Sequence, residues 1–157
     1  MIYQYELMRD SENRRPYLKV VKEIDIDNNR RFSSYDTVML LNDVYGVREF
    51  DSEHAYVIAY DDAYHLIGIY NVSIGDFKSC DMHNRNVGIF LMLSGAKGFA
   101  IVHNHPNGEL LASNDDRMKV ISLQTVGQIL GVDFIGSYII ADEGWLELDK
   151  GVHFYTC

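Results

Sequence analysis

The chain has 157 residues, with 14 lysines and arginines against 23 aspartates and glutamates, and a formal net charge of −9 at pH 7. Its 47 % of hydrophobic residues is typical of one globular domain and excludes wholesale disorder. No apolar run reaches the roughly 18 residues of a membrane-spanning helix. The first residues also lack the basic-then-apolar order of a secretory signal. We therefore expect a cytoplasmic protein that does not bind membranes.

The negative charge is concentrated in the later part of the chain. Residues 1–35 hold seven basic and six acidic residues, whereas residues 36–157 hold seven and seventeen, a net charge of −10. This disfavours indiscriminate nucleic-acid binding, because that affinity comes mainly from lysine and arginine on phosphates. This overall acidity is still compatible with a local basic patch. Two cysteines, Cys80 and Cys157, are too few for a disulfide framework and favour a reducing compartment.

The first 32 residues are predicted to form a β-rich extension. Their pattern predicts strands over 2–8 and 17–26, joined by the polar turn 9–16. Because two strands alone are barely stable, we expect this hairpin to add to the domain that follows rather than to fold by itself. Its open edges are compatible with a monomer or a weak homo-oligomer.

The main domain, residues 33–157, alternates strands with helices. The expected helices run from Ser33 or Ser34 to about Tyr45, from Asn84 to about Ser94, and from Ser113 to Gly131. The expected strands cover 53–60, 65–74, 98–102, 132–141 and 145–148. This order predicts an α/β protein with a mixed sheet and helices packed on its faces.

A His-Asn-His-Pro-Asn-Gly run, residues 103–108, follows the short buried strand. Residues two apart in extended backbone project from one face, so His103 and His105 can aim their imidazoles at one point while Asn104 points the other way. Two histidines and one aspartate, Asp116, would give a zinc ion three ligands and an open fourth position for water. Taken alone, a His-x-His on a strand is more often structural than metal-binding.

Hydrolysis at such a site needs two further groups. A base must take a proton and pass it to the leaving group, and a donor must steady the oxyanion. Ser113, one helical turn before Asp116, is the candidate donor, although an isolated Ser-x-x-Asp is more often only a helix cap. The residues alone leave the base open among Glu49, Asp51, Glu53 and Glu109.

The spacing of these residues resembles the JAMM motif of the MPN/JAB metallopeptidases: His-x-His-Pro, with seven residues between the second histidine and Ser113 and two more before Asp116. The run 103–108 looks most like the bacterial RadC family, whose usual string is His-Asn-His-Pro-Ser-Gly. Residues 52–57, Ser-Glu-His-Ala-Tyr-Val, resemble the start of the first core strand, where the family keeps its catalytic glutamate. Residues 72–75, Val-Ser-Ile-Gly, resemble the block that closes the next strand.

This resemblance implies an MPN/JAB fold, related to the cytidine-deaminase architecture. It implies a Zn²⁺ cofactor held by His103, His105 and Asp116. Glu53 would be the general base and acid, and Ser113 would stabilise the tetrahedral intermediate. The implied activity is that of a zinc metallopeptidase or isopeptidase acting on a protein or peptide substrate.

Departures from the family leave two alternatives open. Asn107 replaces the usual serine, a turn change that leaves the ligands alone. RadC proteins commonly carry an N-terminal helical region that resembles DNA-binding modules, and here residues 1–35 stand in its place, which weakens an inference of work on DNA. The alternatives are a RadC-type protein associated with DNA repair and a scaffold whose metal site is structural. A zinc nucleobase deaminase is excluded because no Cys-x-x-Cys supplies its ligands.

Overall fold

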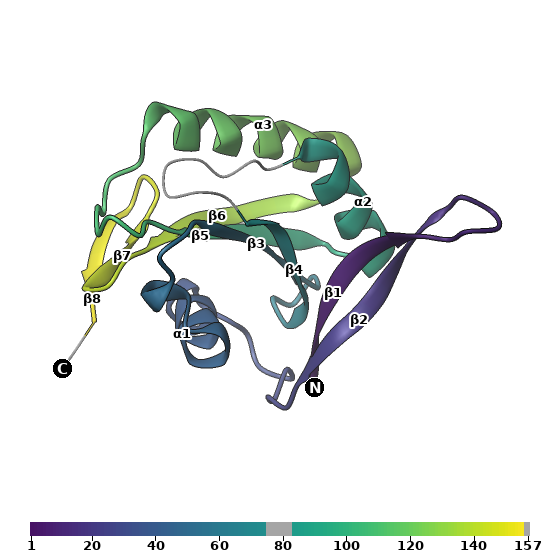
Figure 1. Cartoon of the computed structure of the whole chain (residues 1–157), viewed down its shortest axis with the longest axis horizontal. Helices are drawn as coiled ribbons and strands as arrows, with labels where there is room; N and C mark the ends of the chain where they lie inside the picture. The colour runs from purple at the N-terminus through teal and green to yellow at the C-terminus, as the bar shows by residue number, and fades with distance from the viewer. Residues whose placement is uncertain (75–82, 156–157) are drawn as a thin grey trace.

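The computed structural model describes residues 1–74 and 83–155. Within these ranges, eight strands form one mixed sheet in the order β2-β1-β4-β3-β5-β6-β7-β8, and three α-helices pack against it (Figure 1). The strands are β1 (Ile2–Arg9), β2 (Pro16–Ile24), β3 (His54–Tyr60), β4 (Leu66–Ile74), β5 (Gly98–Asn104), β6 (Asp133–Ile140), β7 (Gly144–Glu147) and β8 (Gly151–Phe154). The helices are α1 (Ser34–Tyr45), α2 (Asn84–Ser94) and α3 (Asn114–Leu130), and a 3-10 turn spans Val47–Glu49. None of the described helices has the length and apolarity needed to cross a bilayer.

The helices cover opposite faces of the sheet: α1 lies on one face, whereas α2 and α3 lie on the other (Figure 1). Successive side chains of a strand point to opposite faces. Tyr56 and Ile58 of β3 therefore pack in the hydrophobic cluster beneath α1, and Val57 packs in the cluster beneath α2 and α3. β5 alternates in the same way, with Val102 in the first cluster and Ile101 in the second. Even-numbered residues of both strands thus face α1, and odd-numbered residues face α2 and α3.

The pairing of β3 with β5 fixes where the two strands end. They are antiparallel, with Ala55 opposite His103, so the beginning of β3 lies beside the end of β5. β5 is buried along its whole length, as expected for a central strand covered on both faces. Residues just before β3 and just after β5 therefore lie next to each other at one end of the sheet.

β1 and β2 form the predicted N-terminal hairpin. β1 joins the main sheet by running parallel to β4, with Gln4 opposite Ile69. Ile2 and Ile24 are 0 % and 5 % exposed and belong to the cluster beneath α1. The mixed α/β sheet with an N-terminal hairpin is thereby confirmed, while the division into residues 1–32 and 33–157 stays a prediction.

The structure corrects the ends of two predicted strands and adds one strand. β2 ends at Ile24 rather than at residue 26, and β5 continues to Asn104 rather than ending at 102, because β6 pairs with it as far as Asn104 opposite Ile140. The sequence did not predict β8. All of its residues are exposed, so it has no alternation of buried and exposed residues, and it is defined by its pairing with β7. Gly75, Cys80 and Cys157, which the sequence analysis named, lie outside the described residues.

Candidate metal centre

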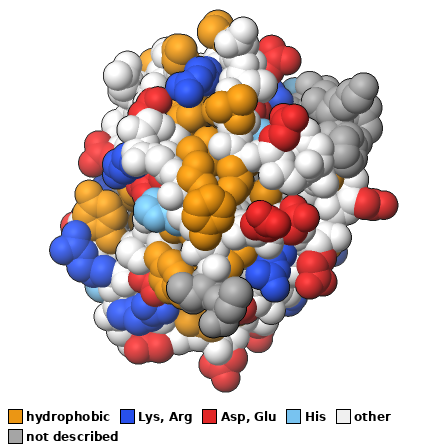
Figure 2. All heavy atoms as spheres, turned by 90° about the vertical axis from the view of Figure 1, so that its left-hand side faces the viewer, with side chains coloured by type: hydrophobic (Ala, Val, Ile, Leu, Met, Phe, Trp, Pro, Cys, Tyr) orange, Lys and Arg blue, Asp and Glu red, His pale blue; other side chains and the backbone are white. Residues whose placement is uncertain are grey.

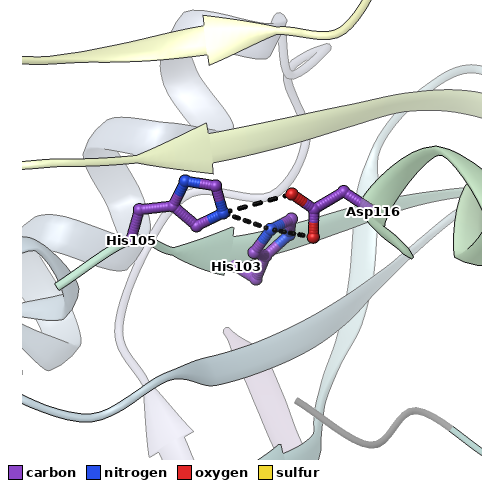
Figure 3. A group of neighbouring side chains, drawn as sticks. All are labelled: His103, His105 and Asp116. Carbon is purple, nitrogen blue, oxygen red and sulfur yellow. Dashed lines mark hydrogen bonds and ion pairs between the residues drawn. The ribbon is translucent and has the colours of Figure 1, made fainter. Parts of the chain in front are cut away.

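His103 and His105 lie at the end of β5 and point toward the same position (Figure 3). Their Nε2 atoms are 3.2 Å apart, and the residues are 7 % and 9 % exposed. The Nδ1 atom of His105 lies 2.8 Å from the backbone oxygen of Glu109. In the tautomer that donates this hydrogen bond, the Nε2 lone pair is directed at the cluster, as in a metal-ligating histidine.

Asp116 comes from the first turn of α3, which packs on the same face of the sheet. Ser113 is the N-cap of this helix: its hydroxyl accepts a hydrogen bond from the Asp116 backbone N–H at 3.1 Å. The Asp116 carboxylate accepts one from the Ser113 backbone N–H at 2.9 Å. This capping box directs the carboxylate, whose two oxygens lie 3.3 Å from the Nε2 atoms of His103 and His105 (Figure 3).

The two histidine nitrogens have the spacing of neighbouring ligands around a small tetrahedral metal ion. With bonds of 2.0–2.1 Å, neighbouring ligand atoms around such an ion are about 3.3 Å apart. The two nitrogens are 3.2 Å apart, which agrees with this value, and each lies 3.3 Å from a different oxygen of the Asp116 carboxylate. All three residues offer a ligand atom within 4.8 Å of the others. His103, His105 and Asp116 therefore form a group that can hold a metal.

The negative charge of Asp116 and the positive charge of a protonated His105 stabilise each other. Burial alone would raise the pKa of the Asp116 carboxyl, but hydrogen bonds to His103 and His105 hold that pKa well below its ordinary value. Burial alone would lower the pKa of His105, but its hydrogen bonds to Asp116 and to the Glu109 backbone raise it. Because metal ligands must be unprotonated, binding of an ion here would release protons.

Glu53, the residue just before β3, is 8 % exposed and shares a cleft with the cluster. The cleft has a volume of ≈ 370 Å³ and is also lined by His105, Asp116 and Ser113. Burial raises the pKa of Glu53; Asp116 adds to the rise, and the nearby histidines oppose it. A raised pKa suits a carboxyl that has to exchange protons near neutral pH.

Of the four acidic candidates for the base, Glu53 and Glu109 line the cleft. The backbone oxygen of Glu109 is the one bound to His105, and its side chain is exposed. Glu53 is instead buried and interacts electrostatically with His103, His105 and Asp116. The structure therefore brings all five predicted site residues to one end of the sheet, with Glu53 as the best-placed acid.

Lys119 is a cleft residue that the sequence analysis did not identify. It lines the cleft one helical turn after Asp116 and interacts electrostatically with Glu53. Its spacing of three residues from Asp116 was a usable signal, because residues i and i+3 lie on the same side of a helix. Lys119 thus places a cation among the acidic groups that line the cleft.

The fold and this group of side chains define the class: an α/β protein with a candidate metal centre at one end of its sheet. Comparison with protein families gives a match over residues 33–151 to the RadC-like JAB domain. The match covers most of the chain, so the chain belongs to the RadC-like JAB domain family. This confirms the family resemblance that the histidine motif indicates.

Several curated proteins are similar to the chain. A UPF0758 protein of Clostridium kluyveri is 29 % identical over 130 residues, which cover 82 % of this chain and 56 % of that protein. A UPF0758 protein of Clostridium acetobutylicum is 31 % identical over 104 residues, or 66 % and 45 % of the two chains. One from Thermotoga maritima is 32 % identical over 89 residues, or 57 % and 40 %. The chain therefore spans about half the length of the curated relatives it matches.

Proposed function

We propose that the chain is a zinc-dependent hydrolase of the JAMM type that cleaves peptide or isopeptide bonds. The observation that supports this most is that the buried Glu53 lines one cleft with His105 and Asp116, two members of a His-His-Asp group that can hold a metal. Two imidazoles and one carboxylate are the ligand types that zinc accepts in catalytic sites with three protein ligands. The 3.2 Å spacing of the two histidine nitrogens, close to that of neighbouring ligands around zinc, adds to this support.

The remaining chemistry belongs to the chain's own side chains. Bound zinc would lower the pKa of a water to about 7 and polarise the scissile carbonyl. Glu53 would accept the proton of the attacking water and then donate it to the leaving amine. Its buried position, which raises the carboxyl pKa, favours this exchange. The relation of the fold to the cytidine-deaminase architecture remains part of this proposal.

Ser113 would stabilise the oxyanion that forms at the scissile carbonyl. Its side-chain oxygen accepts a hydrogen bond from the backbone N–H of Asp116, so its single hydroxyl proton can be donated to a substrate oxygen. Ser113 also lines the cleft. A donor placed before the reaction starts is the kind of group that lowers the barrier of acyl transfer.

A protein or peptide is the substrate class that the surface favours. The start of α3 lies on the same side of the molecule as β7 and β8 (Figure 1). Seen from that side, hydrophobic side chains form a stripe across the molecule, with charged side chains beside it (Figure 2). Leu111, which lines the cleft, is 70 % exposed. Exposed apolar surface next to a cleft is typical of a protein-binding site.

The test is to compare the wild type with Glu53→Gln after both have been loaded with zinc. The variant should keep its zinc and lose about 100-fold or more of its cleavage of a peptide and isopeptide library, because a general base contributes 10²–10⁴-fold. Glu49→Gln is the matched control, since Glu49 is an exposed glutamate four residues earlier, and it should cleave like the wild type. Equal turnover by Glu53→Gln would reject the assigned base. A wild type that holds zinc but cleaves nothing would favour a scaffold.

A further inference from the structure

Asn104, the residue between the two histidines, faces away from the metal-binding group. It is 1 % exposed, and by the alternation of β5 its side chain lies on the α1 side of the sheet. It makes two hydrogen bonds to the chain segment that carries Glu53. Its Nδ2 donates to the backbone oxygen of Ser52 at 3.0 Å, and its Oδ1 accepts from the backbone N–H of His54 at 2.7 Å.

These two bonds bracket Glu53. The backbone ladder between β3 and β5 ends with Ala55 opposite His103, so the amide of Asn104 replaces ladder bonds where the backbone pairing stops. On the same side of the sheet, the ring of His54 stacks on Phe50 with 4.1 Å between ring centres. The backbone on either side of Glu53 is thereby held, which leaves its side chain directed to the opposite, metal-binding face.

We propose that Asn104 is a positioning residue that fixes the carboxyl of Glu53 relative to His103 and His105. The role of Glu53 as a base rests on the proposed function, whereas the two hydrogen bonds of Asn104 do not depend on it. One residue thus links the two halves of the site: its neighbours in sequence bind the metal, and its side chain holds the segment of the base. Supporting contacts of this kind tune how a metal site works.

A purely structural role makes a different prediction. In that role, Asn104 would only complete the end of a strand, and its loss would lower stability without altering the surroundings of the metal. In the positioning role, its loss acts through Glu53. The two roles can be distinguished by introducing Asn104→Ala both into the wild type and into the Glu53→Gln variant, and comparing its effects in the two backgrounds.

The first readout is the visible absorption spectrum of the cobalt-loaded protein, which reports the coordination of the ion without any turnover. We expect Asn104→Ala to shift the spectrum in the wild-type background and to leave it unchanged in the Glu53→Gln background. Asn104→Asp keeps the acceptor for His54 and loses the donor to Ser52, so it should give a smaller shift and serves if the alanine variant does not fold. No shift in the wild-type background, or an equal shift in both backgrounds, would overturn the proposal.

The second readout is amide hydrogen exchange at His54 in the protein without metal. Loss of the acceptor should speed this exchange about 10-fold, the equivalent of one hydrogen bond. An unchanged rate would overturn the proposal whether or not the protein is a hydrolase. Thr37→Val is the control: it removes a buried hydrogen bond of 2.7 Å to Tyr60, within the α1 side of the molecule. It should lower stability and leave both the spectrum and the exchange at His54 unchanged.

Discussion

At the scale of single residues, two serines make the same helix cap in different surroundings. Ser33 caps α1 and Ser113 caps α3, each through a capping box with an aspartate three residues later. Asp36 pairs with the exposed Arg30 at 2.8 Å, whereas Asp116 faces two buried histidines. The cap explains how both aspartates are oriented, and only Asp116 has neighbours with which it could hold a metal.

The same substitution at the two caps distinguishes an effect on stability from an effect on activity. Ser33→Ala and Ser113→Ala should each lower the free energy of unfolding by about 1 kcal/mol, because each leaves a helix N–H without its cap. Only Ser113→Ala should also reduce turnover, by about 100- to 1000-fold, through the loss of an oxyanion donor. Urea denaturation and peptide cleavage of the two variants check this. Equal turnover by both variants would leave Ser113 as a cap and nothing more.

The sequence predicts the histidine pair well because His103 lies in β5 and His105 directly follows that strand, so their spacing is local. It does not single out Glu53 from its acidic neighbours without the family resemblance. What places Glu53 is the register of β3 against β5, which depends on residues about 50 positions apart. The contacts of Asn104 escape prediction for the same reason, because His54 begins β3 and Ser52 lies in the segment just before it, about 50 positions away.

At the scale of elements, two glycines inside helices have opposite surroundings. A Cβ on Gly88 of α2 would lie 3.6 Å from its nearest neighbour, a side-chain carbon of Leu130. A Cβ on Gly127 of α3 would lie 2.6 Å from the backbone oxygen of Val132 and 2.9 Å from the ring of Phe99. The turn from α3 into β6 therefore depends on the absence of a side chain at Gly127.

The same substitution should consequently have opposite effects at these positions. Gly88→Ala should raise the free energy of unfolding by up to about 1 kcal/mol, because alanine favours the helix over glycine. Gly127→Ala should lower it by about 1–3 kcal/mol, because the packed core has no room for the added carbon. Thermal and urea unfolding of the two variants give the measurement. Stabilisation by Gly127→Ala would contradict the described packing of α3 against β6.

The order of the elements follows from local signals: serine caps, terminal glycines and apolar periodicity. Gly46 and Gly131 end α1 and α3 in the left-handed conformation, as their positions in the sequence predict. Among the described strands, the one that these signals do not predict is β8, a short exposed strand without alternation of buried and exposed residues. This strand forms because it pairs with β7, and the sequence of its own four residues does not indicate that pairing.

At the scale of the whole molecule, the hairpin and the main domain share one sheet. β1 pairs with β4, and Ile2 and Ile24 are buried among residues of the main domain. Residues 1–32 therefore contribute to the core as well as to the edge of the sheet. This bears on the predicted division into residues 1–32 and 33–157, which only a shortened chain can test.

A chain of residues 33–157 should be less stable than the full chain by at least about 3 kcal/mol, because two buried isoleucines are worth about 1.5–3 kcal/mol each. It should also be more prone to associate, since β4 would become an open edge. Urea denaturation and light scattering of the two chains are the measurements. An unchanged free energy of unfolding would show the hairpin to be an independent addition.

His103, His105 and Asp116 are proposed to hold a zinc ion. The most direct measurement is the zinc content of the purified wild type and of the double variant His103→Ala with His105→Ala, by elemental analysis of both at equal protein concentration. We expect about one zinc per chain in the wild type and close to none in the double variant, with both proteins folded by circular dichroism. A wild type that holds no more zinc than the double variant would contradict this proposal.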